Sequence, residues 1–412
     1  MRRMLRFPAP FVAAFLLFAV AHACLAPIGE NGVANAPDER AHVTYARLLA
    51  AGHIPAPSDD CEAYGCEWHH PPLMHALGSA LLPLGERRMR ALPIAIGALC
   101  VVLVWIGGRI CAPDEPRVAG IACAFAALIP SHIAVLSAFN NDGLEELCCS
   151  AALVLLLTTI RSGAGLRRSA LLGAAVGAAC LTKVSGLLLL PVTAAALLLA
   201  RRRGRATATL LRAAAVAGVI ALAIAGWWYV RNAALYHDPT LLPTFDAHHA
   251  HTGKSDRLVA ASGWTRYLLK CADFAFHGFW AVYGAPELAP GGARVAVPKP
   301  AYAGAAGVTL AAVAGFALRL KRRRTAPAGQ SDSLAVLSAF AALVAALFVA
   351  FFVRYYQPQA RYLYPAMLPI CVFLSFGWTG LFGGRRARIA DGILIGFLIL
   401  VDAAFLKFVA PY

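Results

Sequence analysis

Charged residues are scarce in this sequence, and acidic residues are scarcer than basic ones. Only 14% of the residues are charged, with 21 Asp and Glu against 37 Lys and Arg, whereas about a quarter of a soluble globular domain is charged. Apolar runs of about 20 residues, long enough to cross a hydrocarbon core of ~30 Å, recur from end to end. The alternating segments that form transmembrane barrels are missing. The sequence therefore predicts an all-α integral membrane protein.

Long polar segments are also missing, so we expect no soluble domain and interpret residues 1–412 as one multi-spanning unit. A net charge of +16 would suit a nucleic acid if it covered one surface, but the basic residues stand in short clusters between apolar runs. These clusters are MRRMLR, RSGAGLRR, RRRGR, RLKRRR and GGRRAR. Such clusters are typical of cytoplasmic loops, where they orient membrane helices. We expect contact with the lipid bilayer and no nucleic-acid partner.

The basic clusters, taken as cytoplasmic, limit how often the chain crosses between them. The run 8–26 has features of a signal peptide, but because many spans follow it we interpret it as an uncleaved first helix. The run 72–84 is too short to cross and is interpreted as a surface or re-entrant helix. Residues 169–200 lie between two basic clusters, which predicts a hairpin of two short helices with Lys183 at its outer tip.

The remaining crossings complete a topology with two large outer loops. Spans are predicted near 90–108, 117–137, 142–160, 206–228, 302–320, 333–353, 361–382 and 389–408. The total is about eleven transmembrane helices. The outer loops, 27–89 and 229–300, are long, whereas every inner loop is short. This asymmetry is typical of an enzyme that works at the outer face of a membrane.

Six motifs follow one another along most of the chain. They are PDERAHVTYARLLAAGHIP after the first span, HHPPL, NND, LTKVSGLLLLP, WWYVRN and QARYLYP. As an ordered set they resemble the GT-C superfamily of membrane glycosyltransferases, to which protein O-mannosyltransferases and lipid A aminoarabinose transferases belong. The resemblance implies a GT-C type fold whose outer loops carry juxtamembrane helices. It also implies transfer, with inversion, of a sugar from a polyprenyl-phosphate donor to a lipid-linked, glycan or protein acceptor. The expected location is the bacterial cytoplasmic membrane, with the active site facing the periplasm.

The resemblance also suggests which acids do chemistry. The catalytic base of the superfamily, an acid in the first outer loop, maps onto Asp38, with Glu39 as the alternative base. Such a base would take the proton of the acceptor hydroxyl. Asp142 is a second candidate, for binding substrate or a cation. Both Asp38 and Asp142 begin predicted helices, so each could instead serve only as a helix cap or first-turn acid.

The phosphate of the donor requires cations. We expect Lys183, Arg231 and Arg361 to bind it, because cations stabilise the phosphate that remains on the lipid and arginine presents a fork that matches phosphate oxygens. His70 is a further donor that the resemblance suggests. Two alternatives stay open: Lys183 could extend to the outer head groups, and Arg231, after an aromatic run, could be an interfacial anchor.

The first outer loop also holds ligand types that suit a metal. Cys61, Cys66, His69 and His70 would suit zinc, but the C-x4-C spacing with adjacent histidines is not a familiar zinc pattern. In an oxidising compartment a Cys61–Cys66 disulfide is the simpler interpretation.

A histidine cluster in the second outer loop is the other candidate. His248, His249 and His251, with Asp246, could bind a divalent metal ion or form a solvated loop. A divalent metal ion is therefore the only cofactor that the sequence suggests.

Two other classes of function remain as alternatives. A transporter or flippase of an anionic lipid or lipid-linked sugar would show internal repeats and helices broken at mid-membrane depth, and a scaffold would need only apolar helices. The observation that separates these hypotheses is spatial. In an enzyme, Asp38, Asp142, Lys183 and Arg361 should come together on the outer side.

Overall fold

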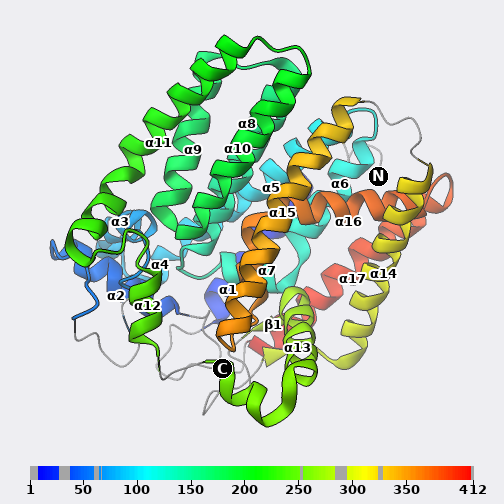
Figure 1. Cartoon of the computed structure of the whole chain (residues 1–412). Coiled ribbons are helices and arrows are strands. Elements are labelled where there is room, and N and C mark those ends of the chain that lie inside the picture. Colours follow the sequence, from blue (N-terminus) through cyan, green and yellow to red (C-terminus); the bar gives the residue numbers. More distant parts are fainter. Residues whose placement is uncertain are drawn as a thin grey trace.

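The computed structural model is a bundle of long helices with shorter helices at one end, the lower end in Figure 1. It describes residues 8–26, 38–59, 65, 67–250, 254–283, 295–322 and 328–409. The long elements are α1 (Ala9–Leu25), α5 (Ala91–Cys111), α6 (Pro116–Leu128), α8 (Asp142–Ser162), α9 (Leu166–Thr182), α10 (Leu189–Arg202), α11 (Thr207–Tyr236), α14 (Lys299–Arg322), α15 (Ala328–Arg354), α16 (Met367–Leu381) and α17 (Arg386–Val409).

The remaining elements lie mostly in the two segments that the sequence predicts as large loops. They are α2 (Glu39–Ala50), α3 (Leu73–Ser79), η2 (Leu82–Leu84), α4 (Glu86–Met89), α7 (Pro130–Leu136), η3 (Val184–Leu188), α12 (Leu242–His248), α13 (Asp256–Trp280) and η4 (Ala360–Ala366). The strands β1 (Val282–Tyr283) and β2 (Val295–Ala296) pair antiparallel. The predicted loops therefore carry helices of their own, as a GT-C type fold implies.

The helices confirm a multi-spanning membrane protein. Among the described residues, eight helices are long and apolar enough to cross a membrane, or nine if the bent pair α6–α7 counts as one span. Helices α1 and α9 have 17 residues each. The number of helices is compatible with the prediction of about eleven crossings. The segment 72–84 holds only the seven-residue α3 and the short η2, and α3 is much too short to cross a bilayer.

Helices α6 and α7 meet at a bend of 64° next to Pro130. A histidine side chain satisfies the carbonyl that the bend leaves without a backbone donor. Pro130 has no N–H to donate to the Ala126 carbonyl, which would otherwise be left unpaired in an apolar interior. The Nδ1 of His132 donates to that carbonyl at 2.7 Å, and its Nε2 lies 2.8 Å from Glu146. The bend ends at the buried turn that leads into α8 and holds Asn140 and Asn141.

The predicted hairpin is present as α9 and α10, with Lys183 at the turn between them. The turn packs tightly, because a Cβ at Gly186 would collide with the Ala179 backbone. Helix α11 continues eight residues beyond the predicted end at 228, to Tyr236. Arg231 therefore lies within a helix rather than at the start of a loop.

Two helices on the other side of the bundle touch backbone to backbone. A Cβ at Gly315 in α14 would overlap the Gly377 carbonyl, and one at Gly377 in α16 would overlap the Ala312 carbonyl. Small residues allow this approach, which matters in a membrane because packing, rather than burial from water, holds helices together. Gly315 and Gly377 therefore explain how α14 and α16 cross closely.

A buried ion pair fixes helix α2 against the bundle. Glu39 accepts hydrogen bonds from Arg90 Nε at 2.9 Å and Nη2 at 2.6 Å, and from the Phe139 N–H at 2.8 Å. Arg90 Nη1 also donates to the carbonyls of Ala23 and Ala26 at 2.8 and 2.6 Å. The side chains of Glu39 and Arg90 are 3% and 2% exposed. The pair thus joins the end of α1, the start of α2, the start of α5 and the turn before α8.

Replacing Glu39 by Gln should destabilise the fold, because it leaves the Arg90 charge buried without its counter-ion. We expect a loss of about 3–5 kcal/mol, measured as a lower melting temperature of the detergent-solubilised protein. Glu86→Gln is the matched control, since Glu86 pairs with Arg47 at the surface. An exposed pair contributes less than about 1 kcal/mol. Equal shifts for the two variants would contradict the structural role of Glu39.

Candidate active site

Asp142 is the centre of a buried cluster of charges. It is the first residue of α8 and is 1% exposed. Lys183 Nζ donates to its Oδ1 at 2.5 Å, and Arg361 Nη1 donates to its Oδ2 at 3.3 Å. The Asp142 N–H is bound by the side chain of Asn140 at 2.9 Å. The Asp142 carboxylate therefore acts as the counter-ion of two cations, and not as the cap of its own helix.

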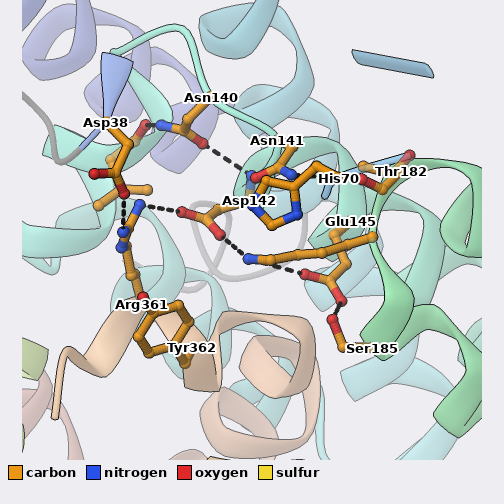
Figure 2. Close-up of polar contacts among 12 residues, drawn as sticks. Asp38, His70, Asn140, Asn141, Asp142, Glu145, Thr182, Ser185, Arg361 and Tyr362 are labelled. Atoms are coloured by element: carbon orange, nitrogen blue, oxygen red, sulfur yellow. Dashed lines mark hydrogen bonds and ion pairs between the residues drawn. The ribbon is translucent and has the colours of Figure 1, made fainter. Parts of the chain in front are cut away.

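Asp38 lies at the exposed edge of this cluster, where it accepts a hydrogen bond from Arg361 Nη2. Arg361 thus bridges the two acids, as Figure 2 shows. The Asp38 side chain is 44% exposed, against 8% for Arg361. Asp38 precedes α2, which the structure describes throughout, yet its side chain caps no N–H of that helix. Its carboxylate is instead turned toward Arg361.

The backbone of Asp38 has a left-handed conformation, with φ 68°. Few residues other than glycine adopt this conformation, and aspartate is one that tolerates it. Residues in this conformation cluster at active sites and ligand clamps. Because the next residue, Glu39, is anchored by Arg90, the chain must turn sharply here, and the turn presents Asp38 to Arg361.

The two cations share an aromatic neighbour and further polar contacts. Lys183 Nζ lies 5.5 Å, and the Arg361 guanidinium carbon 5.2 Å, from the centre of the Tyr362 ring, within the range of a cation–π contact. Lys183 is also 3.7 Å from Glu145, which accepts a hydrogen bond from Ser185. Figure 2 shows Glu145 and Ser185 on the side of Asp142 away from Asp38. These contacts hold both cations in place.

A second wall of the cluster is the segment Glu67 to His70. Glu67 Oε2 lies 3.6 Å from His69 Nε2 and 3.3 Å from His70 Nε2. Burial, and then the neighbouring Asp38 carboxylate, raise the pKa of Glu67. Burial and His70 lower the pKa of His69 to about 3. Burial and the Lys183 ammonium hold the pKa of His70 well below its ordinary value. Both imidazoles are therefore neutral near pH 7.

Helices α2 and α3 pack against the segment Glu67 to His70. His42 Nδ1 lies 2.8 Å from His75 Nε2, which joins the two helices. The Tyr45 hydroxyl donates to the His70 carbonyl at 3.1 Å, and the Tyr45 ring stacks on His75 at 3.9 Å between ring centres. The apolar periodicity of α2 thus buries its histidine and tyrosine where they can orient His70.

Five of the residues that the sequence singles out come together in this cluster. They are Asp38, His70, Asp142, Lys183 and Arg361. Glu39 is separated from it by its buried pair with Arg90. Arg231 packs over Trp228 and Tyr236, at 5.4 and 5.7 Å, and donates to Asn232. Within the described part of the chain it pairs with no carboxylate. Its contacts are those of an aromatic-lined anchor.

The histidines of the second loop lie beside the cluster. His248 is the last residue of α12 and His249 follows it, and the His248 ring meets the Trp68 ring edge-on at 5.6 Å between ring centres. Asp246, their proposed co-ligand, already accepts hydrogen bonds from Lys254, Arg354 and Tyr355. His251 lies outside the described residues, as do both members of the predicted Cys61–Cys66 disulfide.

Three residues of the cluster, Glu67, Ser185 and Tyr362, are not among those predicted from the sequence. Glu67 carries the strongest missed signal, since E-x-H-H places a carboxylate two and three residues from two imidazoles. Tyr362 follows Arg361 directly, and Ser185 follows Lys183 by two residues. Nothing in the local sequence distinguishes these two from ordinary interfacial residues.

The cluster combines two properties that catalysis on an anion requires. Lys183 and Arg361 are held within one site by a buried counter-ion, so they are preorganised for an anionic group. Asp38 is a partly exposed carboxylate within reach of the same arginine, so it can accept a proton from a molecule bound beside that anion.

Known proteins resemble this chain in one segment and in the fold. Residues 69–229 match the family model of dolichyl-phosphate-mannose-protein mannosyltransferases. No curated protein matches the chain at a significant level.

Several solved structures share the fold. The oligosaccharyltransferase of Archaeoglobus fulgidus, in complex with zinc and sulfate, is 14% identical, with a TM-score of 0.56 over 96% of this chain and 53% of that one. ArnT from Cupriavidus metallidurans, bound to undecaprenyl phosphate, is 17% identical, with a TM-score of 0.54 over 98% and 74%. AglB of A. fulgidus, in complex with an inhibitory peptide and a dolichol-phosphate, is 15% identical, with a TM-score of 0.50 over 96% and 56%.

The chain thus spans about half the length of the archaeal oligosaccharyltransferase and most of the length of ArnT. Residues 69–229 thus resemble the dolichyl-phosphate-mannose-protein mannosyltransferase family, and the chain shares the fold of these solved structures.

Proposed function

We propose that the protein transfers a sugar from a polyprenyl-phosphate donor to a lipid-linked, glycan or protein acceptor, with inversion at the anomeric carbon. The observation that carries this proposal is the bridge by Arg361 between exposed Asp38 and buried Asp142, with Lys183 on the other Asp142 oxygen. Two of the structures that share the fold hold a polyprenyl phosphate, undecaprenyl phosphate in one and dolichol-phosphate in the other. Their ligands support the donor class.

Binding of the donor would rearrange the charges at the exposed edge of the cluster. A phosphate offers several acceptor oxygens, so it competes with the Asp38 carboxylate for the Arg361 fork. Asp142 keeps Lys183 and Arg361 in place during this exchange, because its carboxylate is buried with both cations. Arg361 would then hold the phosphate together with Lys183, and the Asp38 carboxylate would be released.

The released Asp38 would act as the general base. It would take the proton of the acceptor hydroxyl as that oxygen attacks the anomeric carbon, while the bond from this carbon to the phosphate oxygen breaks. The bond electrons leave with the polyprenyl phosphate, whose charge Lys183 and Arg361 stabilise. A single attack from the face opposite the leaving group inverts the anomeric carbon.

The distribution of basic residues supports an outward-facing site in the bacterial cytoplasmic membrane. Arg167 and Arg168 lie in the first turn of α9, and Lys183 follows its last residue. A helix of 17 residues separates its two ends by about 25 Å. The arginines therefore lie at the opposite end of the helix from the site. Because basic clusters favour the cytoplasmic side, the site would face the periplasm.

Asp38→Asn should abolish most of the transfer, because the amide cannot accept the hydroxyl proton. We expect the rate of radiolabel transfer from polyprenyl-phosphate sugars to membrane acceptors to fall by about 10²–10⁴-fold, with an unchanged melting profile. Asp59→Asn is the matched control, since Asp59 lies in the same segment and pairs with His53. Undiminished labelling by Asp38→Asn would show that Asp38 is only a partner of Arg361.

Lys183→Met should weaken stabilisation of the leaving phosphate, because one of its two cations is removed. Asp142 would still be paired with Arg361 in this variant. We expect kcat to fall by about 10²–10³-fold, the effect of removing one such donor, and free polyprenyl phosphate to inhibit the variant less than the wild type. The control is Lys254→Met, because Lys254 pairs with Asp246 instead. A normal kcat and normal inhibition of Lys183→Met would move the phosphate site elsewhere, with Arg231 as the next candidate.

A further inference from the structure

Three metal-ligand side chains meet on the wall formed by residues 67–70. One ligand atom from each of Glu67, His69 and His70 lies within 4.8 Å of the other two. We propose that these three side chains bind a divalent transition-metal ion, with zinc as the preferred ion. A carboxylate and two imidazoles form a known three-ligand zinc set that leaves a fourth position open for water or another ligand.

The segment is held in the conformation that brings the three groups together. Glu67 has a left-handed backbone, with φ 50°, which turns its carboxylate back toward the histidines that follow it. The imidazole rings of His69 and His70 lie 4.0 Å apart between ring centres. Trp68, which lies between Glu67 and His69 in the sequence, is 7% exposed. The buried indole anchors the turn, and the Tyr45 hydroxyl fixes the His70 carbonyl. Such preorganisation reduces the entropy that an ion would have to overcome on binding.

The local charge balance also favours a cation at this position. The Glu67 side chain is 17% exposed, and its Oε2 faces both imidazoles, at 3.6 Å from His69 and 3.3 Å from His70. The neighbouring cations Lys183 and Arg361 are paired with Asp142 and Asp38. An ion on Glu67 would therefore compensate a carboxylate whose nearby cations already have counter-ions.

This site differs from the two metal sites that the sequence suggests. It uses Glu67 in place of the cysteines of the same loop, and it uses no residue of the histidine cluster at 248–251. The simplest competing interpretation is that Glu67 only accepts hydrogen bonds from His69 and His70. That interpretation predicts no stoichiometric ion, so metal binding distinguishes the two.

The test is a direct measurement of metal binding by the full chain. The protein is purified in detergent through an affinity tag without histidine, stripped with a chelator, and titrated with zinc and with cobalt. We expect about one zinc ion per chain by elemental analysis, and cobalt absorption bands typical of low coordination number. Zinc should also raise the melting temperature of the stripped protein, because it binds only the folded state.

Two variants remove ligands and one serves as a control. Glu67→Gln and His69→Gln should each weaken zinc binding by at least about tenfold, since even partners of metal ligands contribute this much. His53→Gln should bind zinc like the wild type, although His53 also faces a carboxylate, Asp59, at 2.6 Å in the same segment. Comparing zinc-dependent melting shifts separates lost ligands from lost fold, because a folded variant still melts cooperatively without zinc.

Absence of stoichiometric zinc in the wild type would overturn the proposal. So would equal losses of zinc affinity in His53→Gln and His69→Gln, which would show only unspecific binding by the loop. Neither measurement uses a sugar donor or an acceptor. Failure of this proposal is therefore distinguishable from failure of the proposed transferase activity, which does not depend on it.

Discussion

An ionised carboxylate buried in a membrane protein requires a counter-ion, and the site of this protein depends on how Asp142 meets that requirement. An unpaired charge in a medium of low dielectric constant carries a large free-energy cost. Asp142 is 1% exposed, and it is paired with Lys183 and Arg361, which lie 41 and 219 residues away in the sequence. The start of α8, the α9–α10 turn and the start of η4 are thereby held at one point.

The adjacent acids Asp38 and Glu39 show how one turn of chain separates two roles. Glu39 is buried in its ion pair with Arg90, and this pair fixes the start of α2 to the end of α1 and the start of α5. That anchoring determines where the preceding residue can lie, and the left-handed backbone of Asp38 turns its side chain toward Arg361. The anchoring of Glu39 thus positions Asp38, the proposed catalytic base.

Exposure increases along the chain of charges from Asp142 through Arg361 to Asp38. The side chains are 1%, 8% and 44% exposed. The buried end keeps the cations in place, and the exposed end is where a substrate can compete for Arg361. A site built in this way can exchange one carboxylate for a phosphate without leaving any buried cation unpaired. The wall at Glu67, His69 and His70 adds a second group of polar side chains at the same edge.

The sequence by itself determined the fold class, because membrane crossing depends on apolar run length and on where basic clusters interrupt the runs. It predicted the α9–α10 hairpin with Lys183 at its tip, and a helix beginning after Asp38. It predicted too early an end for α11. The aromatic run WWYV followed by Arg231 is typical of a membrane interface, but it is equally compatible with a helix that continues. It did not predict the bend at Pro130, which precedes the buried turn at Asn140 and Asn141.

The partners of the charged residues were decided only by the tertiary structure. A local sequence pattern cannot distinguish an acid that caps its own helix from one that pairs with a distant cation, because both begin a helix. Asp38 and Asp142 proved to be counter-ions of Arg361, and Arg231 an aromatic-packed residue. Glu67 was overlooked because its link to Asp38 and Lys183 exists only in the folded chain. Hydropathy acts over neighbouring residues, whereas a buried charge is paired by whichever opposite charge the fold brings to it.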